Sequence, residues 1–392
     1  MELHTIEELD SRYLMSTYGR FQVALEEGHG AVAADSKGKE YVDFGSGIGV
    51  NSLGYADPGW AAAVAGQAAK LQHASNLYYS DGQVKLARRL CELSGMGRAF
   101  LCNSGAEANE CAIKLARKYS FDKYGMGRDK IITLQNSFHG RTVTTLAATG
   151  QEVFHNFFFP FTGGFDYVPA GDLEALRAKA DDSTCAVMIE LVQGEGGVRP
   201  LEKTYVKALR QFCSERDLLL IVDEVQTGVG RTGSFYAYQQ YDILPDLVTS
   251  AKGLGGGLPI GACLCAEPLG GVMTAGTHGT TYGGNPIACA AANYVLDRVT
   301  EPGFMEAVTE KGAYLRQTIA SMPGVTAVRG LGMMLGVELT KGTARQAADA
   351  CLEKGLLILT AKEVLRLLPP LTITRQEMDR GLDSLRQALA SL

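Results

Sequence analysis

Long hydrophobic runs are missing from this chain of 392 residues, although 46% of its residues are hydrophobic. Every apolar run is shorter than the roughly 20 residues that a helix needs to cross a bilayer, so we expect no membrane-spanning segment. A secretory signal peptide would place an apolar core near the N-terminus. The chain has charged residues there instead, at Glu2, Glu7, Glu8, Asp10 and Arg12. We therefore expect a cytoplasmic protein.

An excess of positive charge is also absent. The chain has 37 lysine and arginine residues against 43 aspartate and glutamate residues, and this balance gives no electrostatic support for binding nucleic acid. The nine cysteines are scattered. No second cysteine pair or histidine cluster joins Cys263 and Cys265 to complete four ligands, so we expect no metal site. Dispersed free thiols are typical of a reducing cytosol.

The order of the predicted elements divides the chain into three parts. Residues 56–285 alternate strand and helix patterns, which indicates an α/β fold with a parallel sheet. Residues 286–392 carry helical patterns with strands between them, as a second unit. Residues 1–55 begin with a short helix. After that helix, hairpin-like strands are predicted at Val23–Leu25, Ala31–Ala33 and Tyr41–Phe44.

Two residues at predicted strand ends carry the chemistry. Asp223 ends the apolar run 218–222, and Lys252 follows another strand in a glycine-rich stretch. Pyridoxal phosphate (PLP) chemistry needs such a pair, because a lysine amine condenses with the cofactor aldehyde and a carboxylate holds the pyridine nitrogen protonated. Taken singly, each has an ordinary alternative: a solvated loop lysine, and an aspartate that caps a helix.

Further loops have the residues that a phosphorylated cofactor requires. Ser104, Gly105 and Ala106 begin a predicted helix, whose free N–H groups favour an anion, although Ser104 alone would be an ordinary N-cap. The ring of Phe138 could stack on a cofactor, and the guanidinium of Arg141 could bind a carboxylate through two N–H groups. The alternative is that Phe138 is a core residue and Arg141 a surface charge. Because these loops follow predicted strands, we expect them to meet at one edge of the sheet.

With these motifs the chain resembles the PLP-dependent aminotransferases of fold type I, subgroup III, from Tyr13 to Leu371. The resemblance implies a large PLP-binding domain with a mostly parallel central sheet and helices on both faces. It also implies a smaller α+β domain built from the N- and C-terminal segments. The motifs that carry it are Asn103–Asn109, Phe138–Arg141, Gln193–Gly197, Val222–Gly228, Ser250–Gly257 and His278–Pro286.

The resemblance also implies roles for the cofactor-binding residues. Lys252 forms the Schiff base and moves the proton, and Asp223 pairs with the pyridine nitrogen. Backbone groups at Ser104, Gly105 and Ala106 bind the phosphate, although Ala106 stands where threonine is frequent and so lacks a hydroxyl. The remaining ligands are Gln226 at the ring hydroxyl, Phe138 and Val225 on the ring faces, and Thr280 with Thr281 at the phosphate of a neighbouring subunit. A homodimer with shared active sites is therefore expected.

Four residues are implied to bind substrate. Arg141 holds the carboxylate of the amino donor, and Arg366 holds the α-carboxylate of 2-oxoglutarate or glutamate. Glu195 pairs with Arg366 when that substrate is absent. Tyr18 lies where related enzymes place a substrate-contacting tyrosine.

The leading hypothesis is an ω-aminotransferase that moves the distal amino group of N-acetylornithine to 2-oxoglutarate. Other acylated diamines, ornithine and 4-aminobutyrate stay open as donors, because each offers a terminal or branch amine. A semialdehyde aminomutase on the same fold is less favoured, since it needs no external acceptor and leaves Glu195 and Arg366 without a role. A PLP-binding protein without turnover is disfavoured by the intact set of reactive residues.

Overall fold

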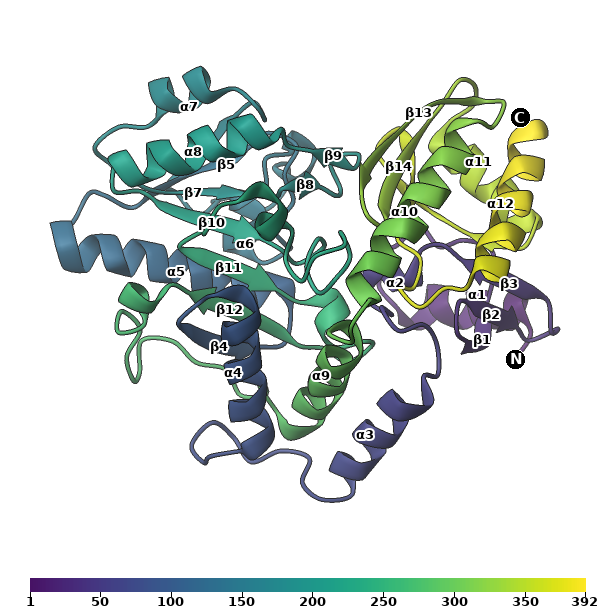
Figure 1. Cartoon of the computed structure of the whole chain (residues 1–392), viewed down its shortest axis with the longest axis horizontal. Coiled ribbons are helices and arrows are strands. Elements are labelled where there is room, and N and C mark those ends of the chain that lie inside the picture. Colours follow the sequence, from purple (N-terminus) through teal and green to yellow (C-terminus); the bar gives the residue numbers. More distant parts are fainter.

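A seven-stranded sheet forms the centre of the larger part of the molecule (Figure 1). The computed structural model describes all 392 residues. In sheet order the strands are β4 (Arg98–Cys102), β12 (Gly261–Cys265), β11 (Leu247–Ser250), β10 (Leu219–Asp223), β7 (Thr184–Ile189), β5 (Lys130–Leu134) and β6 (Phe165–Val168). β12 runs antiparallel to both of its neighbours, and the other pairs are parallel. The mostly parallel sheet predicted from the sequence is confirmed.

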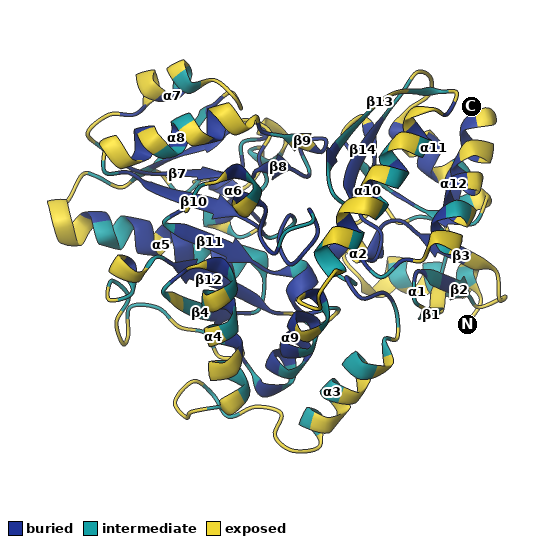
Figure 2. Cartoon of the chain, viewed as in Figure 1, coloured by how far each residue is buried: buried dark blue, intermediate teal, exposed yellow.

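Helices cover both faces of this sheet, which is also as predicted. Alternate strand residues face opposite sides: Leu220 and Val222 belong to one hydrophobic cluster, and Leu219 and Ile221 to another. The central strands are buried throughout, as the dark blue of Figure 2 shows. The helices of this part are α3 (Pro58–Ala68), α4 (Asp81–Ser94), α5 (Gly105–Tyr124), α6 (Val143–Ala148), α7 (Leu173–Lys179), α8 (Lys203–Glu215) and α9 (Pro286–Val299).

Short elements connect these helices and strands. One two-stranded ribbon pairs β8 (Val192–Gln193) with β9 (Arg199–Pro200). The 3-10 helices are η1 (Glu152–Phe154), η2 (Ala237–Tyr241), η3 (Lys252–Leu254) and η4 (Glu267–Leu269). Two of them carry side chains that matter for the site: η3 begins at Lys252, and η1 ends at Phe154.

The smaller part combines both ends of the chain, which lie on the right-hand side of Figure 1. One antiparallel sheet has the order β13 (Val325–Leu331), β14 (Met334–Leu339), β17 (Val364–Leu367), β16 (Leu359–Ala361). A second has the order β1 (Leu25–His29), β2 (Val32–Asp35), β3 (Glu40–Asp43), β15 (Leu356–Leu357). The helices are α1 (Leu3–Tyr13), α2 (Ser46–Gly49), α10 (Phe304–Ala320), α11 (Ala344–Glu353) and α12 (Arg375–Ala390). The pairing of β15 with β3 joins the N- and C-terminal segments in one sheet.

The strands of the N-terminal hairpin begin and end at other residues than predicted. The first strand begins at Leu25, where the predicted one ends, and the second begins at Val32. Gly30, with a φ of 57°, forms the turn between them, a conformation that glycine adopts at little cost. The alternation of apolar residues alone did not locate that turn.

The division at residue 285 stays a prediction. The buried side chains of α9 belong to the same hydrophobic cluster as the large sheet, whereas α10 packs in the cluster of the smaller part. We therefore propose a boundary near residue 300.

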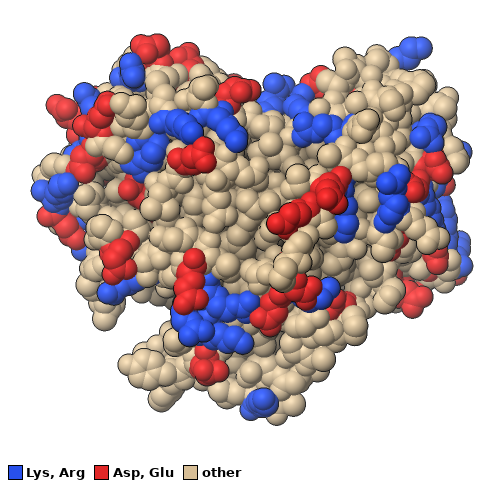
Figure 3. Space-filling view, in the orientation of Figure 1, with Lys and Arg blue, Asp and Glu red and all other residues tan.

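No helix is both long and apolar enough to cross a membrane. Charged residues of both signs are interspersed over the face seen in Figure 3.

Candidate functional site

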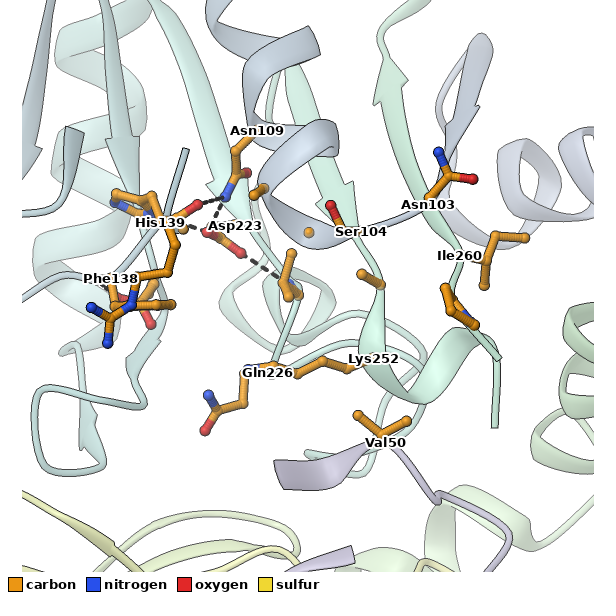
Figure 4. A pocket seen from close by; sticks show the side chains of 18 of the residues that line it. Val50, Asn103, Ser104, Asn109, Phe138, His139, Asp223, Gln226, Lys252 and Ile260 are labelled. Carbon is orange, nitrogen blue, oxygen red and sulfur yellow. Dashed lines mark hydrogen bonds and ion pairs between the residues drawn. The ribbon is translucent and has the colours of Figure 1, made fainter. Parts of the chain in front are cut away.

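A cavity of about 440 Å³ lies at the carboxyl ends of the central strands (Figure 4). In parallel sheets this edge is where ligands bind. The predicted site residues that line the cavity are Ser104, Gly105, Ala106, Phe138, Arg141, Asp223, Val225, Gln226 and Lys252. They come from loops that follow β4, β5, β10 and β11.

The pairing of β10 with β11 sets the positions of Asp223 and Lys252. Asp223 lies opposite Thr249 in the parallel register, and Lys252 follows three residues later at the start of η3. Burial lowers the pKa of the Lys252 ammonium below its ordinary value, while the nearby Glu195 carboxylate acts in the opposite direction. The lowered pKa favours the neutral amine, which is the nucleophilic form.

Asp223 is buried and held by three nitrogen atoms. Its Oδ2 lies 2.8 Å from Asn109 Nδ2 and 2.8 Å from His139 Nδ1, and its Oδ1 accepts a hydrogen bond from Val225 N at 3.0 Å. Figure 4 shows this group on the side of the cavity opposite Lys252. No lysine or arginine pairs with the carboxylate, so its charge remains available to a cation in the cavity. The protonated ring nitrogen of PLP is such a cation, and this end of the cavity fits it.

The N-terminus of α5 forms another wall. Ser104 caps the helix, since its Oγ accepts a hydrogen bond from Glu107 N at 3.2 Å, so the N-cap alternative holds alongside the cavity-lining position. A Cβ atom on Gly105 would lie 2.7 Å from Val225 Cγ1, which explains why glycine stands there. The first turn of a helix leaves N–H groups unpaired and favours an anion. This end fits the PLP phosphate.

Arg366 enters the site from the smaller part of the molecule, on β17. Its side chain is 4% exposed, and Nη1 lies 2.5 Å from Glu195 Oε1 and 3.3 Å from Gln226 Oε1. Gly194 leaves room for this arrangement, because a Cβ there would lie 2.4 Å from Gln226 Oε1. Both parts of the molecule therefore contribute side chains beside the cavity.

Three predicted residues lie away from this cavity within the chain. Tyr18 is 74% exposed and packs beside Arg20. Thr280 and Thr281 line a different hollow of about 700 Å³. The hydroxyl of Thr280 accepts a hydrogen bond from Asn103 Nδ2 at 3.1 Å. The roles of all three stay predictions.

Among the cavity residues without a predicted role are Asn109, His139 and Glu190. Asn109 and His139 contact Asp223, and Glu190 accepts hydrogen bonds from Phe138 N at 2.9 Å and Gly194 N at 3.2 Å. Burial raises the pKa of the Glu190 carboxyl to about 7. Asn109 could have been found from its spacing, since it lies four residues, or one helical turn, beyond Gly105. His139 and Glu190 gave no signal beyond following a strand.

The chain is similar to known transaminases over nearly its whole length. Residues 13–389 match the family Aminotransferase class-III. Acetylornithine aminotransferase of Haemophilus ducreyi is 51% identical over 99% of each chain. Among solved structures, N-acetylornithine aminotransferase from Stenotrophomonas maltophilia has a TM-score of 0.85 and 38% identity, over 98% of each chain.

A second solved relative has PLP at its active site, in partial occupancy. It is the ornithine aminotransferase from Toxoplasma gondii crystallised with oxidised glutathione. Its TM-score is 0.95 at 31% identity, over 100% of this chain and 94% of the other. These matches and the cavity's fit to PLP agree. The chain therefore belongs to the class-III aminotransferases and is a PLP-dependent transaminase.

Proposed function

We propose that this transaminase moves the distal amino group of N-acetylornithine to 2-oxoglutarate. The products are N-acetylglutamate 5-semialdehyde and glutamate, a step of arginine biosynthesis. The ion pair of Arg366 with Glu195 is the observation that carries the proposal. The enzyme binds two substrates in turn at one site. An arginine that binds the carboxylate of one substrate must therefore be neutralised by another partner while the other substrate is bound. The names of the similar proteins support the same donor.

The cofactor is held by residues of the large part. When bound, PLP supplies an aldehyde that takes up the amino group and a ring that withdraws electrons from the neighbouring carbon. Asp223 holds the proton on the ring nitrogen, and Gln226 binds the ring hydroxyl. Phe138 and Val225 enclose the ring between them. The backbone N–H groups of Ser104, Gly105 and Ala106 bind the phosphate.

Lys252 moves the proton during the reaction. Its neutral amine would take a proton from the substrate carbon that carries the amino group and deliver it to the carbon of the cofactor's aldehyde group, and it would move a proton in the reverse direction when the acceptor is converted. Burial favours this neutral form, which acts as the base, by lowering the lysine pKa.

The two arginines divide the substrates between them. Arg141 binds the carboxylate of N-acetylornithine, and Arg366 binds the α-carboxylate of glutamate or 2-oxoglutarate. Leaving a buried charge such as Arg366 without a partner costs about 3–5 kcal/mol. Glu195 supplies that partner while the donor is bound. A semialdehyde aminomutase would have no use for this exchange, which disfavours that alternative.

We also propose a homodimer with shared active sites. Large apolar side chains are exposed on the single chain, with Leu77 88%, Tyr79 103% and Tyr282 64% exposed. Such exposure is typical of an interaction surface. Thr280 and Thr281, next to Tyr282, would bind the phosphate of the neighbouring subunit. The cytoplasmic location stays a prediction.

The donor is tested by half-reactions of the PLP-loaded enzyme. We expect N-acetylornithine to convert the cofactor to its amine form at least about tenfold more efficiently than ornithine or 4-aminobutyrate, because a second free ammonium or a lost acyl contact weakens binding. The readout is the change in cofactor absorbance, followed by its recovery with 2-oxoglutarate. Equal or faster reaction with 4-aminobutyrate would contradict the proposal, and N-succinylornithine tests the choice of acyl group.

The exchange at Arg366 predicts opposite effects of two substitutions. Arg366→Lys should slow the glutamate half-reaction by about one to two orders of magnitude, since lysine cannot replace a bidentate charged contact. Its effect on the N-acetylornithine half-reaction should be smaller. Glu195→Ala should instead impair the N-acetylornithine half-reaction, because Arg366 then stays open. Single-turnover kinetics of each half measure this, and equal losses in both halves would argue against the exchange.

Shared active sites predict complementation between inactive variants. Lys252→Ala lacks the reactive amine, and Thr281→Glu repels the partner's phosphate. Random reassociation of equal amounts should restore about a quarter of wild-type activity, because half of the dimers are mixed and each has one intact site. The measurement is activity before and after denaturation and joint refolding, with each variant refolded alone as the control. A mixture as inactive as its components, or a fully active monomer by ultracentrifugation, would refute the shared site.

A further inference from the structure

Arg141 lines the cavity without an ion pair or a side-chain hydrogen bond anywhere in the chain. Its guanidinium lies over two aromatic rings instead, with Cζ 4.2 Å from the centre of Phe154 and 5.5 Å from the centre of Phe138. Arg366 differs in this respect, because Glu195 already occupies it. The shorter aromatic contact is with a residue that has no place in the function proposed above.

An aromatic partner has a different consequence from a carboxylate partner. The face of a ring attracts the positive charge of a guanidinium without accepting the N–H groups at its edge. A neighbouring aspartate or glutamate would take up two of those N–H groups. Phe154 can therefore restrain Arg141 while leaving the donors of the guanidinium free for a substrate carboxylate.

The loop that carries Phe154 is fixed to the loop that carries Arg141. Gly150 N donates to Ser137 Oγ at 3.0 Å, and Gln151 Nε2 donates to Ser137 O at 3.0 Å. Gly150 lies so close to β5 that a Cβ atom there would be 2.1 Å from Leu134 O.

The far side of the loop and the ring itself are also fixed. His155 follows Phe154 in the chain, and its Nε2 lies 3.0 Å from Leu146 O in helix α6. The ring of Phe154 meets that of Phe138 edge to face, with centres 5.9 Å apart. The ring under Arg141 is therefore held next to Phe138, which lines the cavity.

We propose that Phe154 is a positioning residue for Arg141, and through it a determinant of affinity for the carboxylate of the amino donor. The proposal rests on the function proposed above, in which Arg141 binds that carboxylate. The donor then binds to an arginine that is already placed and unpaired, whereas glutamate has to displace Glu195 from Arg366. Loss of the Phe154 ring should therefore weaken the binding of the donor carboxylate.

Two substitutions separate the ring from its volume. Phe154→Leu removes the π face and keeps an apolar side chain, and Phe154→Tyr keeps the face. Phe157→Leu is the matched control, because Phe157 is 83% exposed and its ring packs on Phe158, away from Arg141. The ligand is 2-acetamidopentanoate, which has the carboxylate and acetyl group of the donor but no distal amine to react.

Calorimetry on the PLP-loaded protein gives the dissociation constant of 2-acetamidopentanoate, and steady-state kinetics give kcat and KM for N-acetylornithine. In Phe154→Leu we expect weaker 2-acetamidopentanoate binding and a higher N-acetylornithine KM, each by about 3- to 30-fold, with a smaller effect on kcat. Phe154→Tyr and Phe157→Leu should resemble the wild type. Unchanged 2-acetamidopentanoate binding in Phe154→Leu, or failure of Phe154→Tyr to restore binding, would overturn the positioning role.

The variant Arg141→Lys distinguishes the role proposed for Phe154 from the role proposed for Arg141 in donor binding. If Arg141→Lys weakens 2-acetamidopentanoate binding and Phe154→Leu does not, the positioning role fails and the function proposed for Arg141 stands. If neither substitution weakens it, both fail. If both weaken it and Phe154→Tyr binds like the wild type, the positioning role is supported.

Discussion

The parallel pairing of β10 with β11 is the constraint on which the site depends. It brings Asp223 and Lys252 to one edge of the sheet, from strands that are buried on both faces. A slip by one residue would exchange the side chains that face the two hydrophobic clusters, for example Leu220 and Ile221. The register is therefore fixed by the core, and the core positions the carboxylate relative to the amine.

Burial gives the charged groups of the site different properties. Asp223 keeps its place through Asn109 and His139 and remains open to a cation in the cavity. Lys252, close by, has a lowered pKa because it is buried. Arg366 is buried and paired, whereas Arg141 at the mouth is exposed and rests on aromatic rings. These contrasts favour a site that binds two carboxylates by two routes, one by exchange of partners and one by direct binding.

Features with a local signal were predictable from the sequence. Buried strands show as continuous apolar runs, so the parallel sheet and the strand-end positions of Asp223 and Lys252 followed directly. Contacts between distant segments have no such local signal. The family resemblance alone implied that the N- and C-terminal segments join, as they do where β15 pairs with β3 across some three hundred residues, and the contact of His139 with Asp223 was not predicted. No pattern within one segment reports such contacts. The predicted bounds of the first hairpin strands were wrong because the turn at Gly30, between two alternating segments, was not recognised.

The central claim is that the amine of Lys252 is the group that bonds covalently to PLP, at the end of β11 and opposite Asp223. Borohydride reduction of the PLP-loaded protein would make that bond permanent, and peptide mass spectrometry would locate it. The account predicts a single labelled lysine, Lys252, and no label in a folded Lys252→Ala variant that still retains PLP. A label on any other lysine in the wild-type protein would contradict the account.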